Sequence, residues 1–146
     1  METRRQAHCV FRCEYHIVWI PRFRFKILTK GLKEYLEIKL LEVRKWYPEF
    51  EYIETNIQVD HVHMIISFPP KYSISQVIQI IKQNTSRALK EKFDFLRTTY
   101  RGGSIWSVGY FVATVGLDEK MIISYVKYQQ KEDLGQANYQ YSAKIH

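Results

Sequence analysis

Two histidines separated by one residue are the first side chains whose spacing suggests chemistry. His61 and His63 fall within residues 60–68, where apolar and β-branched side chains predict a buried strand that ends at the Pro69-Pro70 pair. Residues two apart on a strand point to the same face, with Cα atoms ~6.5 Å apart, while Val62 turns into the core. Both imidazoles can therefore reach one cation. The simpler interpretation is a half-exposed pair on the surface of a strand.

A second pair with chemical potential lies near the end of the chain. Tyr125 and Gln129 are four residues apart in a predicted helix, so they share one face one turn apart. A phenol can act as a nucleophile, and an amide oxygen can be a third ligand beside two imidazoles. The same spacing also suits an ordinary helix surface. Tyr128 is a rival nucleophile, but Glu132 occupies the position four residues beyond it.

The remaining sequence predicts the elements that hold these residues. Hydrophobic periodicity predicts strands over 10–20, 50–59, 60–68 and 105–115, and helices over 31–47, 73–93 and 118 to about 131. Ser73 and Gln76 have the form of a capping box at the start of the second helix. Residues 94–104 are expected to be a basic loop, and Gly109 a bulge or a point of close approach.

The order strand, helix, strand, strand, helix, strand, helix predicts an α+β fold. We expect a ferredoxin-like or RRM-like antiparallel sheet with helices on one face, the other face open, and a C-terminal helix. A single domain is expected over 1–132, followed by a polar tail over 133–146 that is mobile or packs on a partner. An open sheet face suits nucleic-acid binding, but the fold alone does not show catalysis.

Charge is unevenly distributed along the 146 residues, whose formal net charge is +7. Residues 1–30 carry net +5, residues 31–60 net −3 and residues 61–101 net +5, while the remainder balances. Basic residues interleaved with aromatic ones suit single-stranded nucleic acid, whose bases expose their faces. The candidate nucleic-acid contacts are Arg4, Arg5, Arg12, Arg22, Arg24, Lys82, Arg87 and Lys90.

No apolar run approaches the ~20 residues of a membrane span, and the N-terminus lacks the apolar segment of a signal peptide. We therefore expect a cytoplasmic protein without a membrane association.

Five blocks of the chain, in order, resemble a known family. They are residues 15–24 (YHIVWIPRFR), 60–70 (DHVHMIISFPP), 73–75 (SIS) with the helix after it, 105–116 (IWSVGYFVATVG) and 122–129 (IISYVKYQ). Together they resemble the single-tyrosine HUH transposases of bacterial and archaeal insertion sequences in the 200/605 group. The resemblance covers nearly the whole chain.

The resemblance implies a role for each residue of the two pairs. His61 and His63 correspond to the metal-binding pair, and Gln129 to a third protein ligand. Tyr125 corresponds to a nucleophile that attacks single-stranded DNA, leaving a 5′-phosphotyrosine link and a free 3′-hydroxyl. Asp60 corresponds to a residue that orients His61 or its neighbour. The implied cofactor is Mg²⁺ or Mn²⁺, whereas two imidazoles alone favour Mn, Zn or Ni.

The resemblance also implies how the protein assembles and what it recognises. The family works as a homodimer, with the histidine strand of one subunit beside the tyrosine helix of the other, and Gly116 would be the hinge for that exchange. The substrate would be a DNA hairpin with adjacent single-stranded DNA. Val108 departs from the more polar residue expected there. Two alternatives stay open: an RRM-like module that binds nucleic acid without cutting it, and a metal-dependent phosphoesterase in which water attacks.

Overall fold

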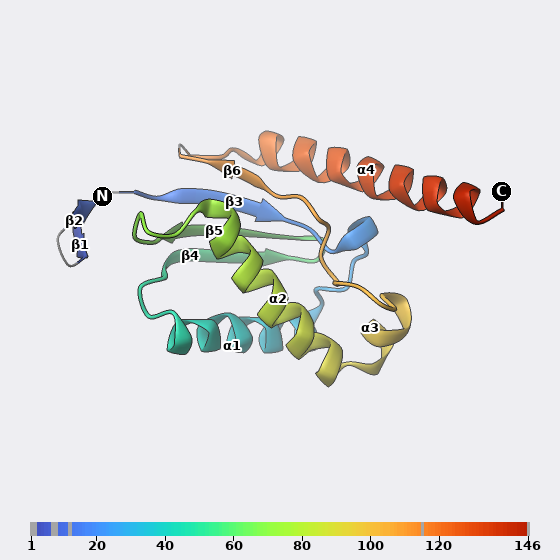
Figure 1. Cartoon of the computed structure of the whole chain (residues 1–146), viewed down its shortest axis with the longest axis horizontal. Helices are drawn as coiled ribbons and strands as arrows, with labels where there is room; N and C mark the ends of the chain where they lie inside the picture. The colour runs from blue at the N-terminus through green and yellow to red at the C-terminus, as the bar shows by residue number, and fades with distance from the viewer. Residues whose placement is uncertain (1–2, 7–8, 12, 115, 146) are drawn as a thin grey trace.

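Four antiparallel strands form the sheet that carries the histidine pair (Figure 1). The computed structural model describes residues 3–6, 9–11, 13–114 and 116–145. The sheet has the order β4-β5-β3-β6, which confirms the ferredoxin-like arrangement. Its strands are β3 (Tyr15–Trp19), β4 (Glu51–Gln58), β5 (His61–Ser67) and β6 (Phe111–Ala113). The other elements are β1 (Arg4–Gln6), β2 (Cys9–Phe11), the 3-10 turn η1 (Arg22–Arg24), α1 (Lys30–Trp46), α2 (Ile74–Lys92), α3 (Asp94–Thr99) and α4 (Glu119–Ile145).

Alternation along β3 separates the two faces of the sheet. Ile17 and Trp19 join the main core with α1 and α2, and Val62 of β5 lies on that side, fully buried as expected. On the other face, Val18 and Ile20 pack against Ile122, Tyr125 and Val126 of α4. The expectation that this face is open is therefore wrong where α4 covers it, because the helix buries its own apolar side chains there.

The capping box at the start of α2 is confirmed. Ser73 Oγ accepts a hydrogen bond from the Gln76 amide at 3.1 Å, and Gln76 Oε1 accepts one from the Ser73 amide at 2.8 Å. Both bonds satisfy donors that a helix start leaves unpaired.

We expect Ser73→Ala to lower the free energy of unfolding by about 1 kcal/mol, because one of these bonds is lost. Urea denaturation measures the change. The exposed Gln79, on the same helix, provides the control: Gln79→Ala should stay within about 0.5 kcal/mol of the unmodified protein. Equal effects of the two substitutions would contradict a stabilising role for the cap.

Residues 105–109 do not extend a strand, so the expected strand over 105–115 is reduced to β6. The segment makes only an isolated bridge, between Trp106 and Pro21, with backbone hydrogen bonds from the Arg22 amide to the Ile105 carbonyl and from the Ser107 amide to the Ile20 carbonyl. Side chains of α2 bind other backbone groups of the segment. Lys82 Nζ donates to the carbonyl oxygens of Ser107 and Gly109, and Ser86 Oγ accepts from the Ile105 amide.

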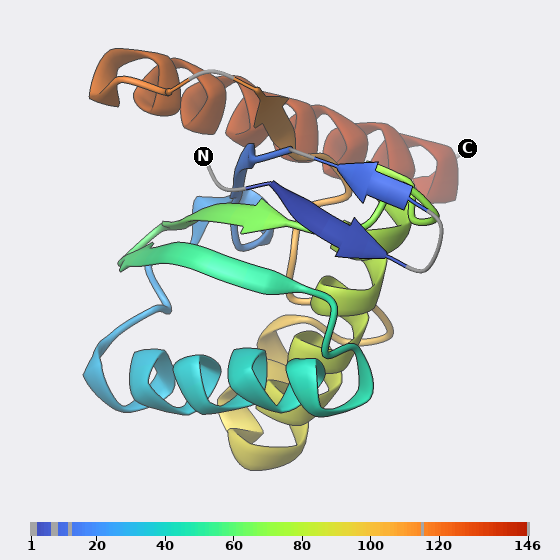
Figure 2. The ribbon, with the colours of Figure 1, turned by 90° about the vertical axis from the view of Figure 1, so that its left-hand side faces the viewer.

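Two other expected boundaries are also wrong. Val10 and Phe11 pair with β1 in a separate hairpin (Figure 2), so the first strand of the main sheet begins at Tyr15 and not at residue 10. Residues 94–99 form α3 where a loop was expected, since Leu96 is fully buried and anchors a helical turn.

The last helix does not end near Lys131. It continues through Gly135 to Ile145, so residues 133–145 extend α4 and do not form a separate polar tail. A single glycine costs a helix only about 1 kcal/mol, and the buried Asp133 anchors this turn. Asp118 Oδ1 accepts from the Met121 amide at 2.8 Å, which confirms the expected N-cap of the helix.

Among the described residues, no helix is both long and apolar enough to span a membrane.

Candidate active site

His61 and His63 lie at the start of β5 on the face that α4 shares. His63 sits directly opposite Val18 of β3, and its ring centroid is 5.8 Å from that of His16. The Nε2 atom of His63 is buried and has no hydrogen-bond partner among the described residues. Burial and the neighbouring His16 lower the pKa of His63. The ring is therefore neutral at pH 7, which is the form that binds a cation.

Asp60 connects the histidine pair to the turn η1. Its Oδ1 is 2.8 Å from His61 Nδ1, and its Oδ2 accepts from Arg24 Nε at 2.8 Å. Burial alone would raise the pKa of Asp60, but the hydrogen bonds with His61 and Arg24 outweigh it and lower that pKa. The ionised carboxylate holds His61 through Nδ1 and leaves Nε2 as the ring nitrogen available to a ligand.

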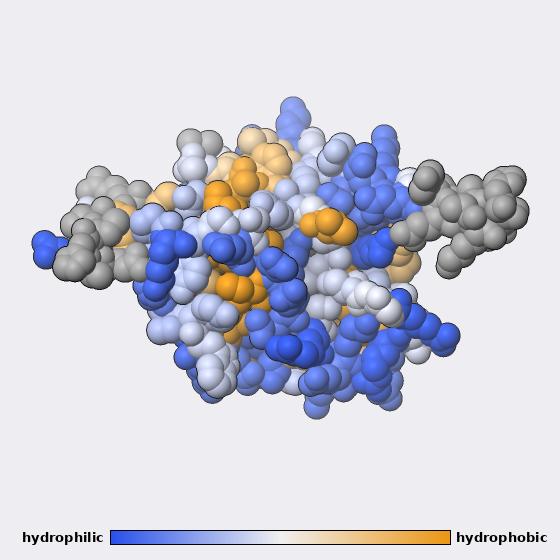
Figure 3. Space-filling model, in the orientation of Figure 1, coloured by the Kyte–Doolittle hydropathy of each residue, from blue (hydrophilic) through white to orange (hydrophobic). Residues whose placement is uncertain are grey.

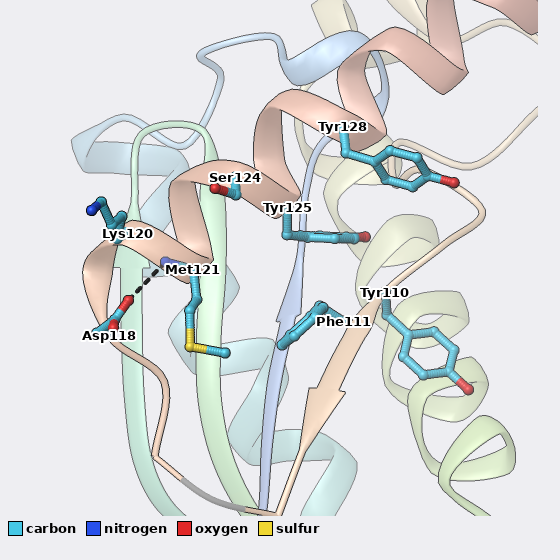
Figure 4. A pocket seen from close by; sticks show the side chains of 8 residues that line it. All are labelled: Tyr110, Phe111, Asp118, Lys120, Met121, Ser124, Tyr125 and Tyr128. Carbon is cyan, nitrogen blue, oxygen red and sulfur yellow. Dashed lines mark hydrogen bonds between the residues drawn. The ribbon is translucent and has the colours of Figure 1, made fainter.

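Tyr125 lies over Phe111 of β6, with ring centroids 5.7 Å apart (Figure 4). Its hydroxyl donates to Gln129 Oε1 at 3.4 Å, which confirms that the two residues share one face of α4. Burial raises the pKa of Tyr125, with smaller contributions from Asp133 and Tyr128, so the phenol is protonated at neutral pH. A pocket of about 620 Å³ opens beside it, lined also by Tyr110, Met121 and Tyr128.

The register of the sheet places the histidine pair and the Tyr125–Gln129 pair at a similar height along the strands. Val18 pairs with His63 on one side and with Phe111 on the other, so the three form a row across one face. Tyr125 stands above the Phe111 end of this row. Two strand spacings separate that end from His63, or about 10 Å. No hydrogen bond or ring contact joins Tyr125 or Gln129 to either histidine within the part of the chain that the structure describes.

A buried carboxylate, that of Asp133, accepts a hydrogen bond from the side-chain amide of Gln129. It is 1% exposed. Its Oδ1 accepts from Gln129 Nε2 at 3.1 Å, and its Oδ2 accepts from the Phe23 amide at 2.9 Å and from Ser107 Oγ at 2.5 Å. Gly109 is a close-approach point, as expected, because a Cβ there would lie 2.4 Å from Gln129 Oε1. The amide of Gln129 is therefore enclosed on several sides.

The turn η1 is strained and joins the two halves of the site. Phe23 and Arg24 have φ values of 63° and 58°, a left-handed conformation that side chains other than glycine rarely adopt. Asp133 holds the Phe23 amide while Asp60 holds the Arg24 side chain. Arg24 also donates to Gln130 of α4 at 3.5 Å. One turn thus contacts both the histidine strand and the tyrosine helix.

The predicted nucleic-acid contacts fall into separate groups. Lys82, Arg87 and Lys90 line one groove of about 820 Å³ between α2 and residues 103–110. Figure 3 shows one face of the molecule, on which hydrophilic residues surround smaller hydrophobic patches. An adjoining pocket of about 440 Å³ adds Arg97 and Arg101, which both lie in the segment expected to be basic.

The other candidates lie elsewhere. Arg4 forms an ion pair with Glu51 at 3.2 Å, and Arg5 is exposed on β1. Arg22 and Arg24 belong to η1. Arg12 lies outside the described residues. Burial lowers the pKa of Lys82 to about 8, and its amine is committed to two backbone carbonyl groups.

The donors of the histidine pair fit a transition-metal cation. His63 Nε2 has no competing partner, and the Asp60–His61 contact is the arrangement typical of metal-binding histidines. No group of three or more His, Cys, Asp and Glu side chains suited to a metal occurs among the described residues. An amide oxygen such as that of Gln129 is a chemically suitable further ligand.

Sequence reasoning missed Asp133, Ser107 and the connecting role of η1. Asp133 is four residues beyond Gln129, so helical spacing alone could have placed the two side chains together. Nothing in the sequence indicates its contacts to Phe23 and Ser107, which lie 110 and 26 residues away.

Comparisons with known proteins find transposases among the relatives of this chain. The chain is 33% identical over 127 residues to the transposase for insertion sequence element IS200 of Salmonella typhimurium, covering 87% of this chain and 83% of that protein. It is 23% identical to the ISDra2 transposase TnpA of Deinococcus radiodurans, covering 91% and 95%.

Two solved structures share the fold. A crystal structure assigned to a transposase of Deinococcus radiodurans has a TM-score of 0.76 at 23% identity, covering 86% of this chain and 97% of that one. A REP-associated tyrosine transposase bound to a REP hairpin has a TM-score of 0.54 at 18% identity, covering 88% and 70%. Residues 9–129 match the family described as "Transposase IS200 like". With most of its length matched, the chain belongs to the IS200-like transposase family.

Proposed function

We propose that this transposase cleaves and rejoins single-stranded DNA through a 5′-phosphotyrosine intermediate, with Tyr125 as the nucleophile. His61, His63 and Gln129 would hold Mg²⁺ or Mn²⁺, and Asp60 would orient His61. The observation that carries the proposal is the row His63–Val18–Phe111 with Tyr125 above its far end. This row places a phenol and an unpartnered imidazole nitrogen on the same face of the sheet.

The reaction exchanges one phosphodiester for another. The Tyr125 oxygen attacks phosphorus, the bond from phosphorus to the 3′ oxygen breaks, and the phenolic proton ends on the released 3′-hydroxyl. The reverse attack by another 3′-hydroxyl rejoins strands without ATP. His61, His63 and Gln129 would hold the cation, which would supply polarisation of the phosphate and compensation of its developing charge. Because burial raises the pKa of Tyr125, the phenol keeps its proton until the attack. Gln129 Oε1 orients the hydroxyl.

The lack of a direct contact between the two pairs leaves room for sites shared between subunits. Within the described residues, no hydrogen bond or ring contact joins Tyr125 or Gln129 to either histidine. A homodimer that exchanges α4, with Gly116 as the hinge, would bring the tyrosine of one subunit to the histidines of the other. A Cβ at Gly116 would meet no atom within 4 Å, so the hinge position is not tightly packed.

The DNA substrate would be a hairpin with an adjoining single strand. One fold relative is a transposase bound to a REP hairpin. Arg87 of the groove and Arg101 of the adjoining pocket would supply cations for phosphates, since the Lys82 and Lys90 amines are committed to backbone carbonyl groups. The half-buried Tyr110 would supply aromatic surface.

A covalent-adduct assay tests the proposal. The protein is incubated with Mn²⁺ and a hairpin-flanked single-stranded oligonucleotide, labelled at the 5′ end in one sample and at the 3′ end in another. A denaturing gel should show the 3′-labelled fragment attached to protein and the 5′-labelled fragment free with a 3′-hydroxyl. Peptide mass spectrometry should locate the nucleotide on Tyr125.

Other outcomes would support the two alternatives. Cleavage into two free fragments would indicate water attack, and hence a phosphoesterase. Binding in a gel-shift assay without any cleavage, with Mg²⁺ or Mn²⁺, would indicate a nucleic-acid-binding module of RRM-like fold.

Gly109 gives a further prediction. In Gly109→Ala the new methyl group would lie 2.4 Å from Gln129 Oε1 and 3.2 Å from its Cδ, so the amide must move. The flexible side chain can yield, so the stability should change by less than about 1 kcal/mol. The cleavage rate should fall about 10- to 100-fold, the typical effect of displacing a group that supports a metal site.

Gly31→Ala, in the first turn of α1 and outside the groove, is the matched control, because a Cβ there meets no atom of the described residues within 4 Å. It should leave the rate within about twofold of the unmodified protein. Equal rates for both variants would contradict a need for close approach at Gly109.

A further inference from the structure

We propose that Asp133 is a positioning residue that determines which atom of the Gln129 amide faces the reaction site. The inference rests on the proposed function, in which the oxygen of Gln129 binds the cation. It concerns the orientation of an amide, whose two ends are alike in shape but opposite in hydrogen bonding.

The contacts of Asp133 leave only one orientation open to Gln129. A carboxylate only accepts hydrogen bonds, so the group that faces Oδ1 at 3.1 Å must be the NH₂ of Gln129. With Nε2 committed, Oε1 points the other way, toward the Tyr125 hydroxyl and Gly109. An amide oxygen has two acceptor sites, so it can accept from the phenol and also bind a cation. An amide NH₂ can do neither.

The other partners of Asp133 fix the carboxylate itself. The Phe23 amide can only donate, and it lies 2.9 Å from Oδ2, so an oxygen is required at that position. Ser107 Oγ donates to the same oxygen. Asp133 is 1% exposed and therefore has little opportunity to exchange these partners for water.

The isosteric substitution Asp133→Asn should reverse the orientation of the Gln129 side-chain amide. The oxygen of the introduced amide has to stay opposite the Phe23 amide, so its NH₂ group faces Gln129. Gln129 must then rotate its own oxygen toward that NH₂, and it presents Nε2 toward Tyr125 and the cation. The shape of the site is unchanged, but its ligand atom is lost.

The double substitution Asp133→Asn with Gln129→Glu should reverse this loss. One oxygen of the carboxylate introduced at position 129 would accept from the NH₂ introduced at position 133. Its other oxygen would face Tyr125 and the cation. The pair exchanges a carboxylate and an amide, so its net charge and its volume are nearly conserved. Because the exchange also restores the hydrogen bond between the two positions, Mn²⁺ affinity, and not stability, is the quantity that tests the orientation.

Mn²⁺ affinity of the full chain tests the inference without any cleavage, using electron paramagnetic resonance of free Mn²⁺ during a titration. Asp133→Asn should raise the Kd about 10- to 100-fold, and the double variant should restore it to within about threefold. Glu132→Gln, which removes an exposed carboxylate from the same turn, is the control and should leave the Kd unchanged. Unchanged affinity in Asp133→Asn, or a loss that the double variant does not reverse, would overturn the inference.

Two further measurements keep the inference testable if Asp133→Asn fails to fold. A folded double variant that binds Mn²⁺ supports it, and a folded double variant that does not bind overturns it. In the unmodified protein, NMR should find the Gln129 side-chain NH₂ protected from exchange with water, and exchange at the rate of a free amide would overturn the inference. If the Mn²⁺ affinities change as expected but no covalent adduct forms, the assignment of Tyr125 as nucleophile is wrong and the role of Asp133 still holds.

Discussion

Replacing Tyr125 by phenylalanine is expected to abolish the covalent protein–DNA adduct and to lower the cleavage rate by on the order of 10⁴-fold or more. The ring contact with Phe111 survives the substitution, and only the 3.4 Å bond to Gln129 is lost. The fold should therefore stay within about 1 kcal/mol of its original stability. Denaturing gels measure the adduct, and thermal unfolding checks the fold.

Tyr128→Phe is the matched control for this prediction. Tyr128 lines the same pocket but is 59% exposed, and Glu132 lies where Gln129 lies relative to Tyr125. Its variant should form the adduct at close to the original rate. An adduct that persists in Tyr125→Phe and disappears in Tyr128→Phe would reassign the nucleophile.

His63→Ala should show the second large effect, a loss of cleavage on the order of 10³-fold with retained binding of single-stranded DNA. Its Nε2 makes no hydrogen bond that the protein would lose, although the atom is buried. The basic groove between α2 and residues 103–110 is formed by other elements, so DNA affinity should change only a few-fold. Single-turnover cleavage and fluorescence anisotropy of a labelled oligonucleotide measure the two quantities separately.

His16→Ala tests whether any imidazole on this face would have the same effect. The His16 ring is 5.8 Å from that of His63, but it lies on β3 and does not belong to the pair on β5. Cleavage in this variant should stay within about threefold of the original rate. Simultaneous loss of folding, binding and cleavage in His63→Ala would instead identify His63 as a structural residue.

Local periodicity was sufficient to predict the elements that position the chemistry. Alternation on β5 places His61 and His63 on one face and Val62 in the core, and spacing on α4 places Tyr125 beside Gln129. These relations depend on neighbours within four residues, for which helix and strand geometry is sufficient.

Relations between distant segments were not predictable in the same way. Residues 105–109 have strand-like composition, yet they form only an isolated bridge to Pro21, and Lys82 and Ser86 of α2 bind other backbone groups of the segment. Gly109 could be recognised as a close-approach point, but the atom that approaches it, Gln129 Oε1, depends on how α4 docks. The role of Asp133 depends on the same docking, since its partners come from three separate segments.

The length of α4 makes its orientation easy to observe. A helix of 27 residues extends about 40 Å, so it reaches well past the short strands that it crosses (Figure 1). A rotation of only about 10° about its first turn would carry its far end through about 7 Å. Spin labels placed near that end and on α1 would report such a displacement as a change in distance. The far end of α4 therefore amplifies small movements at Gly116 into displacements large enough to measure.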